Sequence, residues 1–213
     1  MARHCGIAEQ FATKDAEQAQ ALLRTKRPKW CLQGKLRQFT DNQLRQYIAD
    51  ACGYWSEQCD LVFTETNDRA AADIVIEDHD FGDGPGGVLA DAQLPGPRQQ
   101  LMRIGREGNF VASSNPPSGT TDIVAIICHE SGHIIGFYHL PSGGDLDLME
   151  AFYRAGLRKP QRAESAMARQ WYGAPVARAP PSDPTKPTGK VIIEVTAIVD
   201  GVEYVAKGEA KRK

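Results

Sequence analysis

The stretch His129-Glu130-Ser131-Gly132-His133-Ile134-Ile135-Gly136-Phe137-Tyr138-His139 decides the fold, and the rest of the chain follows outward from it. His129 and His133 are four residues apart, so on a helix they lie on one face, one turn apart, where both imidazoles can bind one metal ion. Glu130 stands beside them and is suited to act as a base on metal-bound water. Three imidazoles, with His139 as the third, leave a fourth position open for water, as in a catalytic zinc site.

An apolar run leads into this motif. Thr120 and Thr121 offer hydroxyl groups for an N-cap, and the apolar residues that follow, up to position 128, predict a buried helix that carries the motif. Gly136 is where this helix must stop if His139 is to turn back to the same metal, because glycine can adopt the left-handed conformation that the turn needs. The shorter pattern alone also suits an amphipathic helix with two ordinary histidines, but the added glycine and third histidine favour a zinc site.

The composition is that of a globular protein without a general attraction for nucleic acid. The chain has 213 residues, 41% of them hydrophobic and 24% charged, with a net charge of −2, which suits one domain with extensions. No apolar run approaches the roughly 20 residues of a membrane span. The first residues contain no apolar signal region, so we expect no secretion address in the chain as given. Five cysteines without framework spacing make a disulfide scaffold unexpected.

Before the motif, the pattern of apolar residues predicts strands and one amphipathic helix. Residues 35–39 alternate as in a strand, and 61–64 and 74–76 are two further strand candidates. Thr40 and Gln43 form a capping box, and the helix behind it has apolar residues at helical spacing. These are Leu44, Ile48, Ala51 and Trp55. A helix between strands, followed by strand after strand, predicts a mixed α/β sheet domain.

The chain is expected to divide into four parts. Residues 1–27 form an N-terminal arm, 28–173 the compact domain, 174–189 a proline-rich linker, and 190–213 a β-hairpin with a basic tail. The pair Asp200-Gly201 between two apolar strands predicts a type I′ turn. Because an isolated hairpin is only marginally stable, we expect this one to pack on the domain, pair with another chain or dock a partner.

The extended motif His-Glu-x-x-His-x-x-Gly-x-x-His is the metzincin signature, and four earlier stretches resemble the catalytic domain of matrixins, the matrix-metalloproteinase branch of that clan. The four stretches are residues 54–57, 61–65, 72–76 and 81–90. The resemblance runs from about Trp30 to Gly173. It implies an α/β (α+β), zincin-like fold, with a twisted five-stranded mixed sheet, long helices and a small C-terminal subdomain. It also implies one catalytic zinc ion and cleavage of protein or peptide substrates.

The family pattern suggests roles for residues after the motif. Matrixins place a methionine in a tight turn beneath the metal, and Met149 is the candidate for this Met-turn. They also have a Pro-x-Tyr segment that walls the pocket for the residue after the cleaved bond. Tyr153 matches this segment, whereas Ala151 stands in the place of the proline. We expect the pocket to be lined also by Ile126 or by the 154–160 loop.

The resemblance also suggests an edge strand that binds substrate. It comprises Gly87, Val88, Leu89 and Ala90. An unpaired edge beside a metal can add an extended peptide as another, antiparallel strand through main-chain hydrogen bonds. The alternative is an ordinary edge strand protected by the nearby prolines, Pro95 and Pro97.

The sequence departs from the family at a second, structural metal site. Matrixins hold a structural zinc with histidines and an aspartate around this loop. His79 and Asp80 could begin such a site, but Asp91 replaces the histidine expected in the edge strand. One histidine with scattered carboxylates makes a poor zinc site, so we expect it to be lost. Calcium, held by Asp83 and nearby carbonyls, is a further possibility that the missing acidic cluster at 101–110 disfavours.

A cysteine near the N-terminus resembles the latency element of matrixin propeptides, which place an Arg-Cys-Gly cysteine on the zinc. Here the sequence reads Arg3-His4-Cys5-Gly6, with an inserted histidine. A thiolate is a good zinc ligand and would displace the reactive water. The alternative is an ordinary thiol on a mobile terminus.

The sequence therefore predicts a zinc-dependent metalloendopeptidase in which Glu130 is the general base. One alternative is a zinc amidohydrolase acting on cell-wall peptide, and another is a non-catalytic binding or assembly protein on the same fold. The family resemblance suggests an extracellular protein, but the absence of a signal region leaves the compartment open.

Overall fold

The computed structural model describes residues 5, 22–82, 87–140, 147–176, 191–199 and 202–210. The chain divides into two compact units, residues 1–176 and 177–213, and each is described by itself. The predicted N-terminal arm, apart from Cys5 and residues 22–27, lies outside the described residues. So do Asp83, residues 177–189 of the linker, the Asp200-Gly201 turn and the last three residues of the tail.

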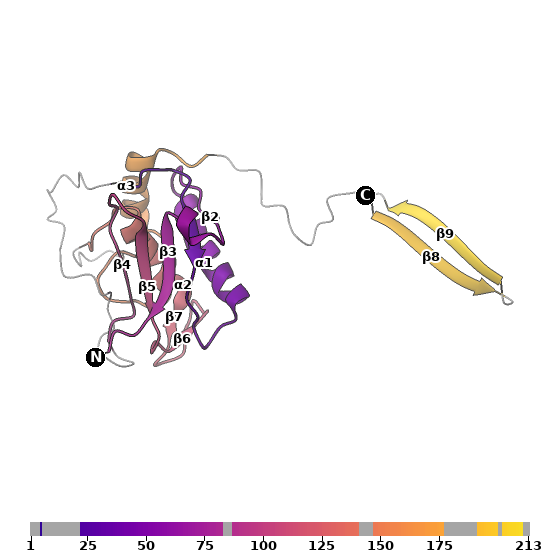
Figure 1. Cartoon of the computed structure of the whole chain (residues 1–213), viewed down its shortest axis with the longest axis horizontal. Helices are drawn as coiled ribbons and strands as arrows, with labels where there is room; N and C mark the ends of the chain where they lie inside the picture. The colour runs from indigo at the N-terminus through magenta and orange to yellow at the C-terminus, as the bar shows by residue number, and fades with distance from the viewer. Residues whose placement is uncertain are drawn as a thin grey trace. The chain divides into compact units, whose positions relative to one another are not determined.

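The first unit is built on a five-stranded mixed sheet, as predicted (Figure 1). Its strands are β1 (Lys29–Leu32), β2 (Thr64–Glu65), β3 (Ile74–His79), β4 (Ala90–Ala92) and β5 (Gln100–Gly105). They stand in the order β2-β1-β3-β5-β4. The first four strands of this order pair in parallel, and β4 pairs antiparallel to β5. The strand β4 is therefore the last of the sheet on one side.

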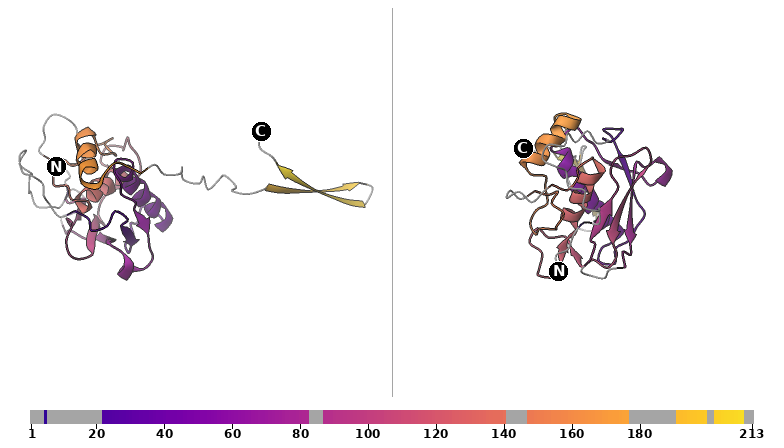
Figure 2. Two further views of the ribbon diagram at one scale, coloured as in Figure 1. Left: turned by 90° about the horizontal axis from the view of Figure 1, so that it is seen from above. Right: turned by 90° about the vertical axis from the view of Figure 1, so that its left-hand side faces the viewer.

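Alternating residues of the sheet divide between two apolar clusters. Ile74 and Ile76 of β3 belong to the main core, whereas Val75 between them packs with Cys31 in a smaller cluster. This alternation follows from the opposite directions of successive side chains in a strand. Helices α1 (Asp41–Ser56) and α2 (Ile123–Ile134) lie together on one face of the sheet (Figure 2). The main core is therefore the layer between the sheet and these helices.

The helix α1 forms as its sequence predicts. Thr40 is the N-cap, and the reciprocal bonds between Thr40 and Gln43 complete the capping box. All four predicted core positions of this helix are buried. The remaining elements of the first unit are the 3₁₀ turn η1 (Arg69–Ala71), the short parallel pair β6 (Phe110–Val111) and β7 (Thr121–Asp122), and α3 (Arg162–Tyr172). Within the described part of the chain, no helix has the length and apolar character needed to cross a membrane.

Three local predictions were wrong. Residues 35–39 are not a strand, because the Lys35 amide donates to the Asp78 carboxylate instead of to a neighbouring strand. The strand of this region is β1, which lies earlier in the chain. Of residues 61–64, only Thr64 belongs to a strand. The N-cap of α2 is Asp122 rather than a threonine, and its carboxylate accepts from the Val124 amide at 3.3 Å.

Two other expectations are confirmed. None of the five cysteines forms a disulfide. In the second unit, β8 (Val191–Val199) and β9 (Val202–Ala210) pair antiparallel over their full length as the predicted hairpin. The second strand is longer than the sequence pattern indicated.

The two central helices approach closely where α2 has a glycine. Trp55 of α1 is fully buried, and its indole Nε1 donates to the carbonyl of Cys128 at 2.8 Å. A Cβ on Gly132 would collide with the Met149 sulfur and lie 2.9 Å from Cζ2 of Trp55. The absence of a side chain at position 132 therefore lets Trp55 and Met149 pack directly against the helix that carries the histidines.

We predict that Gly132→Ala destabilises the protein by about 1–3 kcal/mol, because the added methyl group overpacks this contact. The matched control is Gly53→Ala in α1, where nothing lies within 4 Å of the added Cβ. That change should stabilise by about 0.5–1 kcal/mol, because alanine loses less conformational freedom in a helix. Urea unfolding measures both, and equal effects of the two substitutions would contradict the packing argument.

Candidate metal centre

The structure brings the three histidines of the motif together. His129 and His133 are on the last turns of α2, which ends at Ile134. Gly136 has a φ of 110°, in the left-handed region, and the chain turns there so that His139 returns to the other two. The ring centroids of the three imidazoles are 4.8, 4.8 and 5.4 Å apart. The turn at Gly136 thus does what the sequence predicted.

Two hydrogen bonds orient the imidazoles of α2. Nδ1 of His129 donates to the Leu148 carbonyl, and Nδ1 of His133 donates to the Phe137 carbonyl, both at 2.7 Å. A carbonyl only accepts, so the proton lies on Nδ1 and the lone pair on Nε2. The two Nε2 atoms are 3.0 Å apart. Burial lowers the pKa of His129 to about 4 and that of His133 well below its usual value, so both rings are neutral at pH 7.

This arrangement fits a zinc ion. Two lone pairs that face each other at 3.0 Å repel unless a cation lies between them, and neutral imidazole nitrogens are preferred zinc ligands. The ligand atoms of His129, His133, His139 and Cys5 all lie within 4.8 Å of one another. Three nitrogens and one sulfur make a donor set for tetrahedral zinc.

Cys5 lies in this group although it is more than a hundred residues away in sequence. Its Sγ is 3.5 Å from Nε2 of His133 and 3.7 Å from Oε2 of Glu130, and the side chain is buried. Its backbone amide donates to the Ala151 carbonyl at 3.1 Å. The thiol therefore reaches the position that a fourth ligand would take.

Glu130 is buried with the histidines but stands outside the group of ligand atoms. Only 1% of its surface is exposed, and burial raises the pKa of its carboxyl group to about 8, an effect that the contact with Cys5 partly opposes. A carboxyl group with a pKa near neutrality can both accept and release a proton at physiological pH.

The segment after the motif, which contains Leu148 and Met149, packs against the helix that carries the histidines. Met149 is fully buried against Gly132, and its amide donates to the carboxylate of Glu164 on α3 at 2.6 Å. Glu164 also accepts from the amide of Gln161, and burial raises its pKa to about 7. Sequence reasoning selected Met149 but missed Glu164. The available signal was the spacing of a capping box, since Glu164 lies three residues after Gln161, the N-cap of α3.

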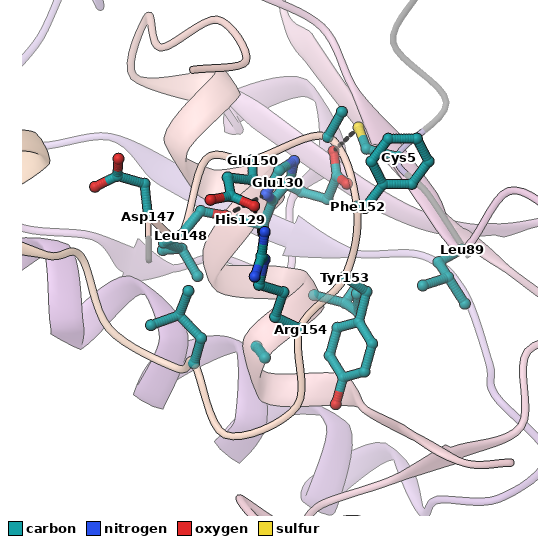
Figure 3. Close-up of a pocket in the computed structure, with 14 residues that line it drawn as sticks. Cys5, Leu89, His129, Glu130, Asp147, Leu148, Glu150, Phe152, Tyr153 and Arg154 are labelled. Atoms are coloured by element: carbon teal, nitrogen blue, oxygen red, sulfur yellow. Dashed lines mark hydrogen bonds and ion pairs between the residues drawn. The ribbon is translucent and has the colours of Figure 1, made fainter. Parts of the chain in front are cut away.

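A pocket opens beside His129 and Glu130 (Figure 3). It contains about 380 Å³ of space not filled by atoms, including its open mouth. Both regions expected to line it do so, since Ile126 and Leu157 are in its wall together with Tyr153. The other lining residues are Cys5, Leu89, Ala125, His129, Glu130, Asp147, Leu148, Glu150, Ala151, Phe152 and Arg154.

An ion pair ties the wall of this pocket to the start of the metal-bearing helix. Asp122, the N-cap of α2, has a fully buried side chain that receives two hydrogen bonds from Arg158 at 2.5 and 2.9 Å. The Asp122 amide donates to the Tyr153 hydroxyl at 3.0 Å. Tyr153 is thereby fixed against the helix. Sequence reasoning did not select Arg158, because its partner is 36 residues away and no local pattern marks it.

The predicted substrate-binding edge lies next to the site, but its strand begins later than expected. Only Ala90 of the four selected residues is in β4, and Gly87, Val88 and Leu89 lead into it. Leu89 is buried in the pocket wall, and its carbonyl accepts from the amide of Gly105 in β5 at 2.8 Å. One side of this segment is therefore bonded to the sheet through Leu89.

An arginine stands among the residues considered for a structural zinc. Arg103 forms an ion pair with Asp91 through two hydrogen bonds, and its Nη1 is 3.4 Å from Nε2 of His79. The Asp80 carboxylate instead accepts from the Gly82 amide. A guanidinium ion in this place repels a divalent cation, which gives the expected loss of the second zinc a physical reason. That loss and the low expectation for calcium stay predictions.

Comparison with known families agrees with the geometry. The matrixin family model matches residues 22–168, from the chain before β1 into α3. The chain belongs to the matrixin family, whose members are zinc metalloendopeptidases and are generally extracellular.

Several curated matrix metalloproteinases are similar to the chain. Stromelysin-3 of Homo sapiens is 35% identical over 129 residues, covering 54% of this chain and 24% of the relative. Stromelysin-3 of Xenopus laevis is 32% identical over 157 residues, covering 70% and 31%. Neutrophil collagenase of Homo sapiens is 30% identical over 117 residues, covering 51% and 24%. The matched regions thus span only about a quarter to a third of these relatives.

We predict that Arg158→Met destabilises the zinc-loaded protein by about 3 kcal/mol, because it leaves the buried Asp122 carboxylate without its counter-ion. The adjacent Lys159→Met is the control. Its ion pair with Glu57 is exposed on both sides, so its loss should cost less than about 1 kcal/mol. Denaturant unfolding distinguishes the two, and a small effect of Arg158→Met would show that the pair does not hold the pocket wall.

Proposed function

We propose that this chain is a zinc-dependent metalloendopeptidase with Glu130 as its general base. The observation that supports this role is the position of Glu130. Its carboxylate is 3.7 Å from the same thiol that reaches the imidazoles, yet it is not one of the four residues whose ligand atoms cluster. A carboxylate beside a metal, but not bound to it, is placed to move protons.

The histidines, His129, His133 and His139, would hold the zinc through their ring nitrogens. Zinc bound there would supply Lewis acidity and lower the pKa of a water molecule in the fourth position. Glu130 takes the proton of the attacking water and passes it to the nitrogen of the leaving amine. Burial raises the pKa of this carboxyl group and so favours the protonated form between these two transfers.

The proposed substrate is an extended peptide that lies beside β4. The outer edge of this last strand offers main-chain groups for an additional strand. In the pocket wall, the Ala151 carbonyl accepts a backbone amide, that of Cys5. The side chain after the cleaved bond would enter the pocket walled by Tyr153 and Leu157.

We propose that Cys5 keeps the enzyme latent. Its thiol is 3.5 Å from Nε2 of His133 and its amide donates to the Ala151 carbonyl, so Cys5 would take the place of a fourth zinc ligand and uses a main-chain acceptor that a peptide would need. A thiolate bound to zinc would exclude the water that the reaction needs.

We also propose that residues 28–173 are the catalytic domain and that the hairpin after the linker serves to attach a partner. The separation of residues 177–213 as a second unit is compatible with this division. Two strands alone are marginally stable in water, which is the physical reason to expect a partner for the hairpin.

The first prediction from this proposal concerns Glu130→Gln. In a Cys5→Ser background, it should lower kcat for a quenched peptide mixture by about 10²- to 10⁴-fold, because the base is lost. Zinc should stay bound, as measured by metal analysis of the dialysed protein. The control Glu57→Gln changes an exposed carboxylate at the C-terminal end of α1 and should keep full activity.

A different result would select an alternative. If the Cys5→Ser chain binds one zinc and cleaves no protein-derived peptide, but releases amines from cell-wall peptide, the substrate class is wrong. If it binds zinc and hydrolyses neither, the chain is a non-catalytic protein on a metalloprotease fold.

The second prediction concerns Cys5→Ser. It should raise the rate of peptide hydrolysis at least about tenfold over the wild-type chain, because the competing thiol ligand is removed. Zinc content should be unchanged, since three histidines remain. The control Cys31→Ala removes a thiol on the other face of the sheet and should leave the rate as it is. Equal rates of the wild-type and Cys5→Ser chains would contradict latency through this thiol.

A further inference from the structure

The pocket beside Glu130 has a single arginine in its wall. Arg154 lies across the pocket between Leu148 and Tyr153 (Figure 3). The Arg154 side chain is 46% exposed, so its end remains open to solvent and to a ligand.

A buried carboxylate holds this arginine in place. Nε of Arg154 donates to Oε2 of Glu150 at 2.7 Å, and the Glu150 side chain is only 3% exposed. A carboxylate with so little access to water needs its counter-ion nearby, because an unpaired buried charge is strongly unfavourable. Arg154 is therefore fixed in the pocket by Glu150.

The ion pair leaves donors of the guanidinium available. Arginine has five N–H groups in a rigid fork, and the bond to Glu150 uses the one on Nε. Among the described residues, no other hydrogen bond from the Arg154 side chain is formed. The four N–H groups on the two terminal nitrogens can therefore bind oxygen atoms of a ligand in the same pocket.

The terminal N–H groups of Arg154 favour a hydrogen-bond acceptor as its ligand, and the carboxyl groups that also line the pocket are those of Glu130, Asp147 and Glu150. Glu150 is neutralised by Arg154 itself. The carboxylate of Asp147 points away from the Arg154 guanidinium (Figure 3). An ammonium group entering the pocket would meet the guanidinium, and a purely apolar side chain would cover its N–H groups without replacing their hydrogen bonds to water.

We propose that Arg154 selects the substrate, and that the pocket takes glutamate or glutamine as the residue after the cleaved bond. This inference rests on the proposed peptidase function. The stem of such a side chain would pack on Ile126, Leu148 and Leu157, and its terminal oxygens would receive hydrogen bonds from the fork of Arg154.

The test uses peptide ligands that bind the zinc directly. Because the zinc then fixes which side chain enters the pocket, the test does not depend on cleavage. A series of short peptide hydroxamates chelates the zinc and presents one variable side chain, that of Glu, Gln, Met or Lys, to the pocket. Calorimetry measures their dissociation constants for the zinc-loaded, full-length Cys5→Ser chain. We expect the Glu and Gln compounds to bind at least about tenfold more tightly than the Met and Lys compounds.

Substitution of the ion pair should remove this preference. The double variant Glu150→Met/Arg154→Met replaces both charges with side chains of similar length, so that no buried carboxylate is left unpaired. We expect it to bind the Met compound at least as tightly as the Glu compound. Arg154→Lys keeps the charge without the fork and should retain only part of the preference. Arg162→Met, on the exposed face of α3, is the matched control and should change nothing.

Two outcomes would overturn the inference: tightest binding of the Met or Lys compound to the Cys5→Ser chain, or a Glu preference that survives in the double variant. Failure of the proposed function looks different. A chain that binds the Glu compound in preference to the Met compound, yet cleaves no peptide, would retain the selective pocket without being a peptidase.

Discussion

Two hydrogen bonds from imidazole to backbone are the constraint on which the metal centre depends. The carbonyls of Leu148 and Phe137 each accept from the Nδ1 of a histidine on α2, which turns both Nε2 lone pairs to one point. Burial keeps the rings neutral, so that their mutual repulsion is relieved only by a cation. The fold thus orients two of the imidazole ligands, those of His129 and His133, without a metal ion. His139 supplies the third nitrogen after the turn at Gly136.

The carbonyl that orients His129 is itself held by a chain of contacts through the core. Leu148 precedes Met149, whose amide is bonded to Glu164 on α3 and whose sulfur packs on Gly132. The last helix therefore positions the first ligand, although the two are far apart in sequence. The helix α3 contributes no metal ligand, but without it the Met149 segment would lose its hydrogen bond to Glu164.

The parts of the site that the sequence predicted are those encoded by spacing within one element. The histidines, the glycine turn and the capping box of α1 all follow from offsets of three or four residues, and the structure contains them. The ion pairs of Asp122 and Asp91 were missed because a charged residue gives no sign of a partner that is distant in sequence. The pair of Glu150 with Arg154 has helical spacing but lies outside a helix, where that spacing predicts no contact. The strand expected at 35–39 was wrong for a related reason, since a distant side chain, Asp78, takes the Lys35 amide.

The bond from the Cys5 amide to the Ala151 carbonyl has a consequence for how the enzyme would begin to act. A blocking segment on the same chain works at an effective concentration of roughly millimolar or more, whatever the dilution of the protein. A substrate that binds the site with similar affinity and is present at micromolar levels would be outcompeted by it, so raising the substrate concentration would hardly relieve the block. The onset of proteolysis would then be first order. Its rate constant would be that of detachment, oxidation or removal of Cys5, and it would not depend on the substrate concentration.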